Sequence, residues 1–298
     1  MNRPHLSFLP VACALSGLAL FAMMDGLMKA ASIAVGAYSA VFWRNMLGAG
    51  ITAPLWLWRR KQWPNGPALR LHALRSAVAA TMTLLFFFGL VRTPLAEAVA
   101  LSFIAPLVAL YLAAAVLGER VSRRAIIGSF AALGGVVVIV LGGVGSAAAS
   151  HRHPEALTGL AAILASALLY GWNLILQRQQ AQLAEPEEIA FFQTFGVFVL
   201  LAAGAPWLVS MPLPASWAII ATAAVLAAIS LMLMSWAYAR AEAQALVPLE
   251  YTAFIWAALT GWVVFREPVT MATMAGVALI VAGCLFAAPR QDRIEVPA

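Results

Sequence analysis

The chain has 298 residues, of which 63% are hydrophobic and only 10% are charged, and its mean hydropathy is +0.91. Soluble domains carry about 25% charged residues, so this composition excludes an ordinary soluble domain and indicates a polytopic membrane protein. In such proteins basic residues set the orientation, so the net charge of +6 does not indicate a nucleic-acid partner. Both cysteines, Cys13 and Cys284, lie in apolar runs, and no Cys/His cluster has metal-ligand spacing. We therefore expect no metal, no cofactor and no disulfide framework.

The apolar runs predict ten membrane-spanning helices, because each is close to the roughly 20 residues that a bilayer requires. In chain order the predicted spans are 8–28, 35–58, 73–91, 95–117, 125–143, 157–177, 189–209, 215–238, 243–264 and 270–288. The first run is interpreted as an uncleaved helix. With a cytoplasmic N-terminus, 13 of the 18 Lys and Arg residues fall on the inside, which predicts that both termini are cytoplasmic. The histidines, including His72, are expected in loops or at helix ends, which disfavours an integral-membrane enzyme.

The sequence resembles itself when it is shifted by 148 positions. The shift aligns Asp25 with Asn173, Lys29 with Gln177, Asn45 with Gln193, Gly48 with Gly196, Arg92 with Arg240, Glu119 with Glu267, Gly128 with Gly276 and Gly135 with Gly283. This predicts two five-helix halves, residues 1–148 and 149–298. Because each half has an odd number of spans, the second enters the membrane in the opposite orientation. Inverted repeats recur in secondary transporters, whose substrate sites lie near the midplane between the halves.

Several segments resemble the EamA-type branch of the drug/metabolite transporter superfamily. They are "LGERVSRRAIIGSFAALGGVVVIVLG" (117–142), "FREPVTMATMAGVALIVAGCLF" (265–286), "VFWRNMLGAG" (41–50) and "AVALSFIAPLVALYLAAAVLGE" (98–119). The second half departs from the pattern where Phe192 aligns with Arg44 and Phe254 with Pro106. The resemblance implies an all-α integral membrane fold of ten transmembrane helices, arranged as two inverted five-helix repeats around a central cavity. It also implies export of small metabolites by a multi-pass protein of the bacterial inner membrane.

Charged residues inside the predicted spans are candidates for function, since a charge in a bilayer is costly and is usually paired or functional. Asp25 is expected about four residues, or roughly 6 Å, below the outer end of the first span. A salt bridge with Lys29 or Arg44 is one interpretation; an outer gate or proton-responsive carboxylate, mirrored by Asn173 at the inner side, is the other. Arg44 is interpreted either as a structural partner or as a site for a substrate carboxylate.

Glu250 follows Pro248 inside the ninth predicted span, where a proline can loosen the helix. It is a candidate for proton coupling or for binding a substrate amino group, with a hydrogen-bonded structural carboxyl as the alternative. Glu119 and Glu267 are expected to be structural, each at the N-terminus of the helix that follows it. Four glycines are expected to form a scaffold seam between the fifth and tenth spans. They are Gly128, Gly135, Gly276 and Gly283.

Aromatic residues gather on the spans that the resemblance places around the cavity. The cavity candidates are Phe86, Phe103, Tyr170, Trp172, Asn173, Trp236, Tyr238, Glu250 and Tyr251. Each aromatic could equally face lipid. An aromatic cavity with few charges favours neutral or aromatic amino acids, as in exporters of the YddG type, over sugar phosphates. A multidrug or other-metabolite exporter of the same fold is the alternative, and an enzyme or a channel lies outside this class. Small-molecule substrate and lipid are the expected partners, with no prediction of oligomeric state.

Overall fold

The computed structural model describes residues 8–59, 63–117, 123–149, 153–181, 183–238 and 249–287, and the elements described are all helices. In chain order they are α1 (Phe8–Val35), α2 (Ala37–Arg59), α3 (Gly66–Leu90), α4 (Leu95–Ser102), α5 (Ala105–Leu117), α6 (Arg123–Ala149), α7 (His153–Ala181), α8 (Pro186–Ala202), α9 (Ala205–Leu208), α10 (Pro214–Tyr238), α12 (Ala253–Phe265) and α13 (Met271–Ala287). Of the predicted site residues, Glu119 and the side chain of Tyr238 lie outside the described part.

Four stretches of helix are each long and apolar enough to cross a membrane: Leu9–Val35, Gly66–Leu90, Glu155–Gln177 and Pro214–Met234. Shorter apolar helices cover Leu95–Ala109, Ile126–Gly142, Ala253–Phe265 and Met271–Phe286. Large apolar side chains such as Phe130 and Trp207 are widely exposed on the outside of the bundle. A surface of this kind suits lipid, because large exposed apolar areas are unusual on soluble monomers.

Two of the predicted spans are interrupted, so the expectation of uninterrupted helices is wrong there. The span predicted at 95–117 is divided between α4 and α5. Pro106 cannot donate a backbone hydrogen bond to Ser102, and the chain passes through tight turns in which Phe103 N bonds to Ala100 O. The span predicted at 189–209 is likewise divided between α8 and α9, with Pro206 in the short second helix.

The first and third helices are longer than the apolar runs predicted. α1 continues to Val35, and only Gly36, with a φ of +83°, separates it from α2. α3 begins at Gly66 rather than near residue 73, because the Asn65 side chain accepts a hydrogen bond from Ala68 N at 2.9 Å and caps the helix. As a consequence, His72 is buried inside α3 rather than in a loop or at a helix end.

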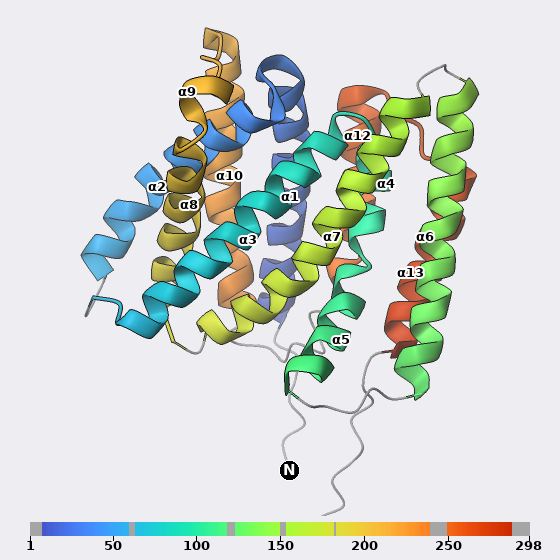
Figure 1. The fold of residues 1–298 in the computed structure, drawn as a ribbon, viewed down its shortest axis with the longest axis horizontal. Coiled ribbons are helices and arrows are strands. Elements are labelled where there is room, and N and C mark those ends of the chain that lie inside the picture. The colour runs from blue at the N-terminus through green and yellow to red at the C-terminus, as the bar shows by residue number, and fades with distance from the viewer. Residues whose placement is uncertain are drawn as a thin grey trace, which may run out of the picture.

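The helices pack in pairs that are distant in sequence (Figure 1). α6 packs on α13 at one edge of the bundle, and α2 packs on α8 at the opposite edge. Between them, α1 packs on α10 and on α12, α3 on α7, and α5 on α7, while α4 contacts α12. The main apolar core therefore joins helices from both ends of the chain.

Glycines let the α6–α13 pair approach closely. A Cβ added at Gly135 would lie 2.4 Å from the Gly276 carbonyl oxygen, and one at Gly283 would lie 2.4 Å from the Gly128 carbonyl oxygen. Small residues permit this backbone-to-backbone contact between helices in lipid.

Candidate functional site

The middle of α1 carries Asp25, which is buried within the bundle. Because α1 extends to Val35, Asp25 lies ten residues, or about 15 Å, before the end of the helix and not near its outer end as expected. Arg44 on α2 interacts with it electrostatically. The Arg44 guanidinium also approaches Met24 Sδ at 3.5 Å and lies 5.6 Å from the centre of the Phe87 ring. The Arg44 guanidinium therefore lies against the Phe87 ring and within electrostatic range of the Asp25 carboxylate.

Lys29 pairs with a different carboxylate from the one proposed for it. Its Nζ forms an ion pair with Glu267 and donates to the Thr93 carbonyl at 2.7 Å. The interpretation that Lys29 forms a salt bridge with Asp25, one turn away on the same helix, is therefore wrong. The side chain of Lys29 is only 4% exposed, so the ion pair is largely removed from water.

Glu267 is not the cap of the helix that follows it. Its other carboxylate oxygen, Oε2, accepts a hydrogen bond from Leu95 N at 2.8 Å, at the first residue of α4. The cap of α13 is Thr270, whose hydroxyl accepts from Thr273 N at 3.1 Å. Glu267 therefore satisfies an orphan amide, as expected of it, but on a helix that begins 172 residues earlier.

The hydroxyl of Tyr170 on α7 lies within electrostatic range of charged side chains from several helices. Glu250, Asp25 and Arg75 all act on it electrostatically. They come from the helical turn before α12, from α1 and from α3. Charges of both signs therefore act on one phenol in the interior, where Coulomb interactions are stronger than in water.

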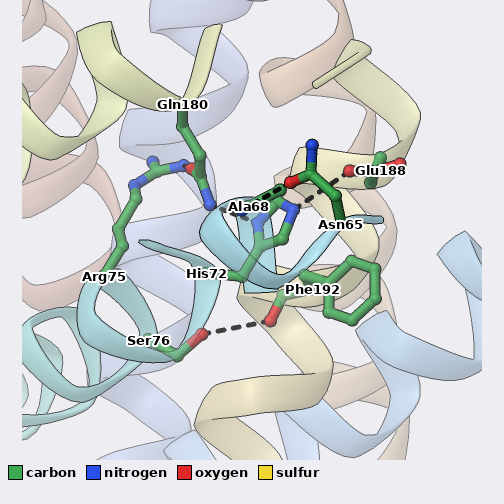
Figure 2. Close-up of polar contacts among 8 residues, drawn as sticks. All are labelled: Asn65, Ala68, His72, Arg75, Ser76, Gln180, Glu188 and Phe192. Atoms are coloured by element: carbon green, nitrogen blue, oxygen red, sulfur yellow. Dashed lines mark hydrogen bonds and ion pairs between the residues drawn. The ribbon is translucent and has the colours of Figure 1, made fainter. Parts of the chain in front are cut away.

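A buried polar network leads from this point toward the beginning of α3 (Figure 2). Arg75 Nε donates to Asn173 Oδ1 at 3.1 Å, and its Nη1 donates to the Gln180 side-chain oxygen. The Gln180 amide nitrogen bonds to His72 Nδ1, and His72 Nε2 lies 3.1 Å from Glu188 Oε1. The network joins α3, α7 and α8.

The predicted aromatic residues are divided between the interior and the surface. Phe103 is buried and meets the Tyr251 ring edge-on at 5.2 Å, and Phe86 packs edge-on against Phe87. Trp236 is half-buried. Trp172 is 41% exposed and lines an open groove between α5 and α7 with Leu112, Ile175, Leu176 and Gln179. Trp172 is therefore exposed in this groove rather than buried in the core, and its assignment to the cavity stays a prediction.

Comparison with known proteins identifies the family. The model of the "EamA-like transporter family" matches residues 9–141 and again residues 157–288. The chain belongs to the EamA-like transporter family. It is therefore a multi-pass membrane protein of a transporter family, within the drug/metabolite transporter superfamily.

Relatives of this EamA-like chain carry transporter names. The pseudopaline exporter CntI of Pseudomonas aeruginosa is 23% identical, over 89% of this chain and 90% of its own length. A riboflavin transporter of Brucella anthropi is 24% identical, over 84% of this chain and 87% of its own. An uncharacterized transporter of Helicobacter pylori is 26% identical, over 90% of this chain and 91% of its own length. A solved crystal structure matches 93% of this chain and 96% of its own with a TM-score of 0.61 at 21% identity, which shows a shared fold alone.

The sequence reasoning missed most of the polar network of this EamA-like chain. The predicted boundaries place Arg75 near the cytoplasmic end of the span 73–91 and leave Gln180 and Glu188 just outside the spans 157–177 and 189–209. The signal that could have found them is "NGP" at 65–67, since an Asn before a Gly-Pro pair is typical of a helix start. A helix beginning there places Arg75 well inside the membrane, where a charge is itself a functional indication.

Proposed function

We propose that this protein is a secondary transporter that exports small metabolites by alternating access, with neutral and aromatic amino acids as its substrate class. The observation that carries the proposal is that charges of opposite sign, Asp25 and Arg75, are both buried in the interior of the bundle, and that both act electrostatically on Tyr170, as Glu250 does. An α-amino acid carries one charge of each sign, so a site with carboxylates and a guanidinium is complementary to it. The buried Phe103–Tyr251 pair adds aromatic surface, and Tyr251 is close enough to Glu250 for an electrostatic interaction.

The packing of the helices supports an inverted repeat of residues 1–148 and 149–298. A shift of 148 positions replaces α1 by α7 and α3 by α10, and the α1–α10 contact then becomes the α7–α3 contact; both are present. The same exchange relates α3–α8 to α2–α10, and α5–α7 to α1–α12. The two family matches also begin 148 positions apart. In Figure 1, α1 and α7 begin at opposite faces of the bundle.

On this proposal the interrupted helices each count as one span. α4 with α5, and α8 with α9, complete five spans in each half, which gives ten around a central cavity. The distribution of Lys and Arg supports an orientation with both termini in the cytoplasm, and the family favours the bacterial inner membrane as its location.

Two contacts between the halves support alternating access. Lys29–Glu267 joins the far end of α1 to the loop before α13, while His72–Glu188 joins the beginning of α3 to α8. α1 and α3 begin at the same face, so the two contacts lie at opposite ends of the bundle (Figure 1). If the halves rock against each other, opening either end requires one of these contacts to break. Asp25 and Asn173 lie between them and are the proposed gate residues.

The relatives favour a second candidate, which is export of a different metabolite or of a drug. One of them is named a pseudopaline exporter and another a riboflavin transporter, and neither name is that of an amino-acid carrier. The same fold and the same alternating access would serve this function. An integral-membrane enzyme or a channel lies outside both of these candidates.

The test is uptake of labelled amino acids and riboflavin into proteoliposomes, with and without the unlabelled compound trapped inside. Protein-free liposomes and heat-inactivated protein are the controls. Saturable uptake of neutral or aromatic amino acids that the trapped compound accelerates supports the proposal. Uptake of riboflavin alone would favour the second candidate. Unsaturable flux, together with electrical conductance, would indicate a channel.

A further inference from the structure

Among the residues that the structure describes, no acidic side chain forms an ion pair with the buried Arg75. It lies nine residues into α3, about 14 Å from the beginning of the helix, and it is 4% exposed. Within the described residues its guanidinium donates to Asn173 and Gln180, and both acceptors are neutral amide oxygens. Burying a charge costs several kcal/mol unless an opposite charge and further hydrogen bonds compensate it. The position of Arg75 therefore calls for an anion that these contacts do not supply.

The polar network connects Arg75 to a carboxylate only indirectly. The path runs from Arg75 through Gln180 and His72 to Glu188, and Figure 2 shows the bonds between His72 and its two partners. A guanidinium has five N–H donors, and two of them, on Nε and Nη1, are used here. Within the described part of the chain, three donors are left for a further acceptor.

Arg75 also interacts electrostatically with the Tyr170 hydroxyl on α7. Through Tyr170 the guanidinium belongs to the same interior group of charges as Glu250 and Asp25. Arg44, which the sequence suggested as the anion site, already interacts with Asp25 and with the Phe87 ring. Arg75 is the better placed of the two to receive a new anion.

We propose that Arg75 binds the carboxylate of the transported substrate, an inference that rests on the proposed amino-acid function. A carboxylate matches the fork of a guanidinium and forms charge-assisted hydrogen bonds, which are roughly twice as strong as those to a neutral amide. The ammonium group of the same substrate then lies on the side of Glu250 and Asp25. Arg75 thereby selects acids over their neutral derivatives.

The experiment compares an amino acid with its primary amide, which keeps the ammonium group and the aromatic ring but has no carboxylate. Proteoliposomes exchange labelled phenylalanine, and unlabelled phenylalanine or phenylalaninamide competes. For the wild type we expect the amide to compete at least tenfold more weakly than the acid. In Arg75→Gln the half-inhibitory concentration of phenylalanine should rise roughly 10–100-fold while that of the amide stays nearly constant, because one charged hydrogen-bonding partner is lost.

Two further variants keep the test decisive. Arg70→Gln removes an exposed cation five residues earlier on the same helix, and it should keep the wild-type preference for the acid. Arg75→Lys keeps the charge but not the fork, so its preference should be intermediate. If Arg75→Gln does not yield a monodisperse protein, Arg75→Lys decides the question by the same ratio of inhibitory concentrations.

An unchanged acid-to-amide preference in the folded Arg75 variants overturns the inference and leaves the amino-acid function standing. Equal competition by phenylalanine and phenylalaninamide in the wild type also overturns the inference about Arg75 but not the amino-acid function. Absence of amino-acid exchange by the wild type would overturn the proposed substrate class and the inference together.

Discussion

Replacing Gly135 by alanine should separate the α6–α13 pair. The added Cβ would lie 2.4 Å from the Gly276 carbonyl oxygen and 2.8 Å from Ile280 Cγ1, whereas ordinary contacts begin at 3.4 Å. The carbonyl belongs to the backbone and cannot rotate away as a side chain can. The two helices must therefore move apart by about 1 Å at this point, which loosens the packing on either side.

Gly134 is a matched control for the size of the effect. It is exposed, and a Cβ added there meets nothing within 4 Å. Both substitutions gain about 1 kcal/mol of helix propensity, so this contribution cancels in the comparison. What remains is the cost of overpacking, typically 1–3 kcal/mol. For a protein of this size the melting temperature of Gly135→Ala should be lower than that of Gly134→Ala by roughly 2–5 °C.

The assay is thermal unfolding in detergent, followed with a dye that becomes fluorescent when it reacts with a thiol. Cys284 lies buried on α13, with its thiol near the Phe103 carbonyl, and becomes reactive when the pair separates. Gly276→Ala should behave like Gly135→Ala, because its Cβ would lie 2.6 Å from the Gly135 carbonyl oxygen. If Gly135→Ala is as stable as Gly134→Ala, the close approach is not required and the steric reasoning is refuted.

The remaining predictions concern charged groups. Lys29→Met leaves the partly buried Glu267 carboxylate without its cation and should lower the free energy of unfolding by about 3 kcal/mol. Arg59→Gln, which breaks an exposed ion pair, should lower it by less than 1 kcal/mol in the same unfolding assay, and equal losses would refute the assigned burial. Glu250→Gln should abolish stimulation of uptake by a pH gradient while leaving exchange intact; unchanged gradient dependence would exclude Glu250 as the coupling carboxylate. Asp25→Asn should slow transport per folded molecule, and an unchanged rate would leave Asp25 a structural role with Arg44.

The sequence was sufficient for the class of the protein, because family membership depends on features that lie close together in the chain. Apolar runs locate the helices, and the Glu and Gly pattern around 117–142 and 265–286 indicates the family. The boundaries failed where a helix continues through buried polar residues. A criterion based on apolar runs starts the span at residue 73, which leaves His72 outside it and Arg75 at its edge, whereas the Asn65 cap fixes the true beginning of α3 at Gly66.

The pairing of charges was the part that local sequence could not give. Lys29 and Asp25 lie one turn apart, and that spacing is the reason for the predicted salt bridge. The actual partner, Glu267, is 238 positions away and is brought close only by the packing of α1 against α12. Likewise Arg75 meets Asn173 and Gln180 because α3 packs along α7, and the sequence alone does not specify that contact.

The position of Glu267 has a consequence for the order in which the protein is assembled. A ribosome makes Lys29 and the first turn of α4 long before it reaches residue 267, yet the Glu267 carboxylate binds both the Lys29 ammonium and Leu95 N. Until α12 has entered the membrane, a nascent chain carries a lysine and a helix start without this common partner. One side chain near the end of synthesis therefore completes a region that was begun near its start.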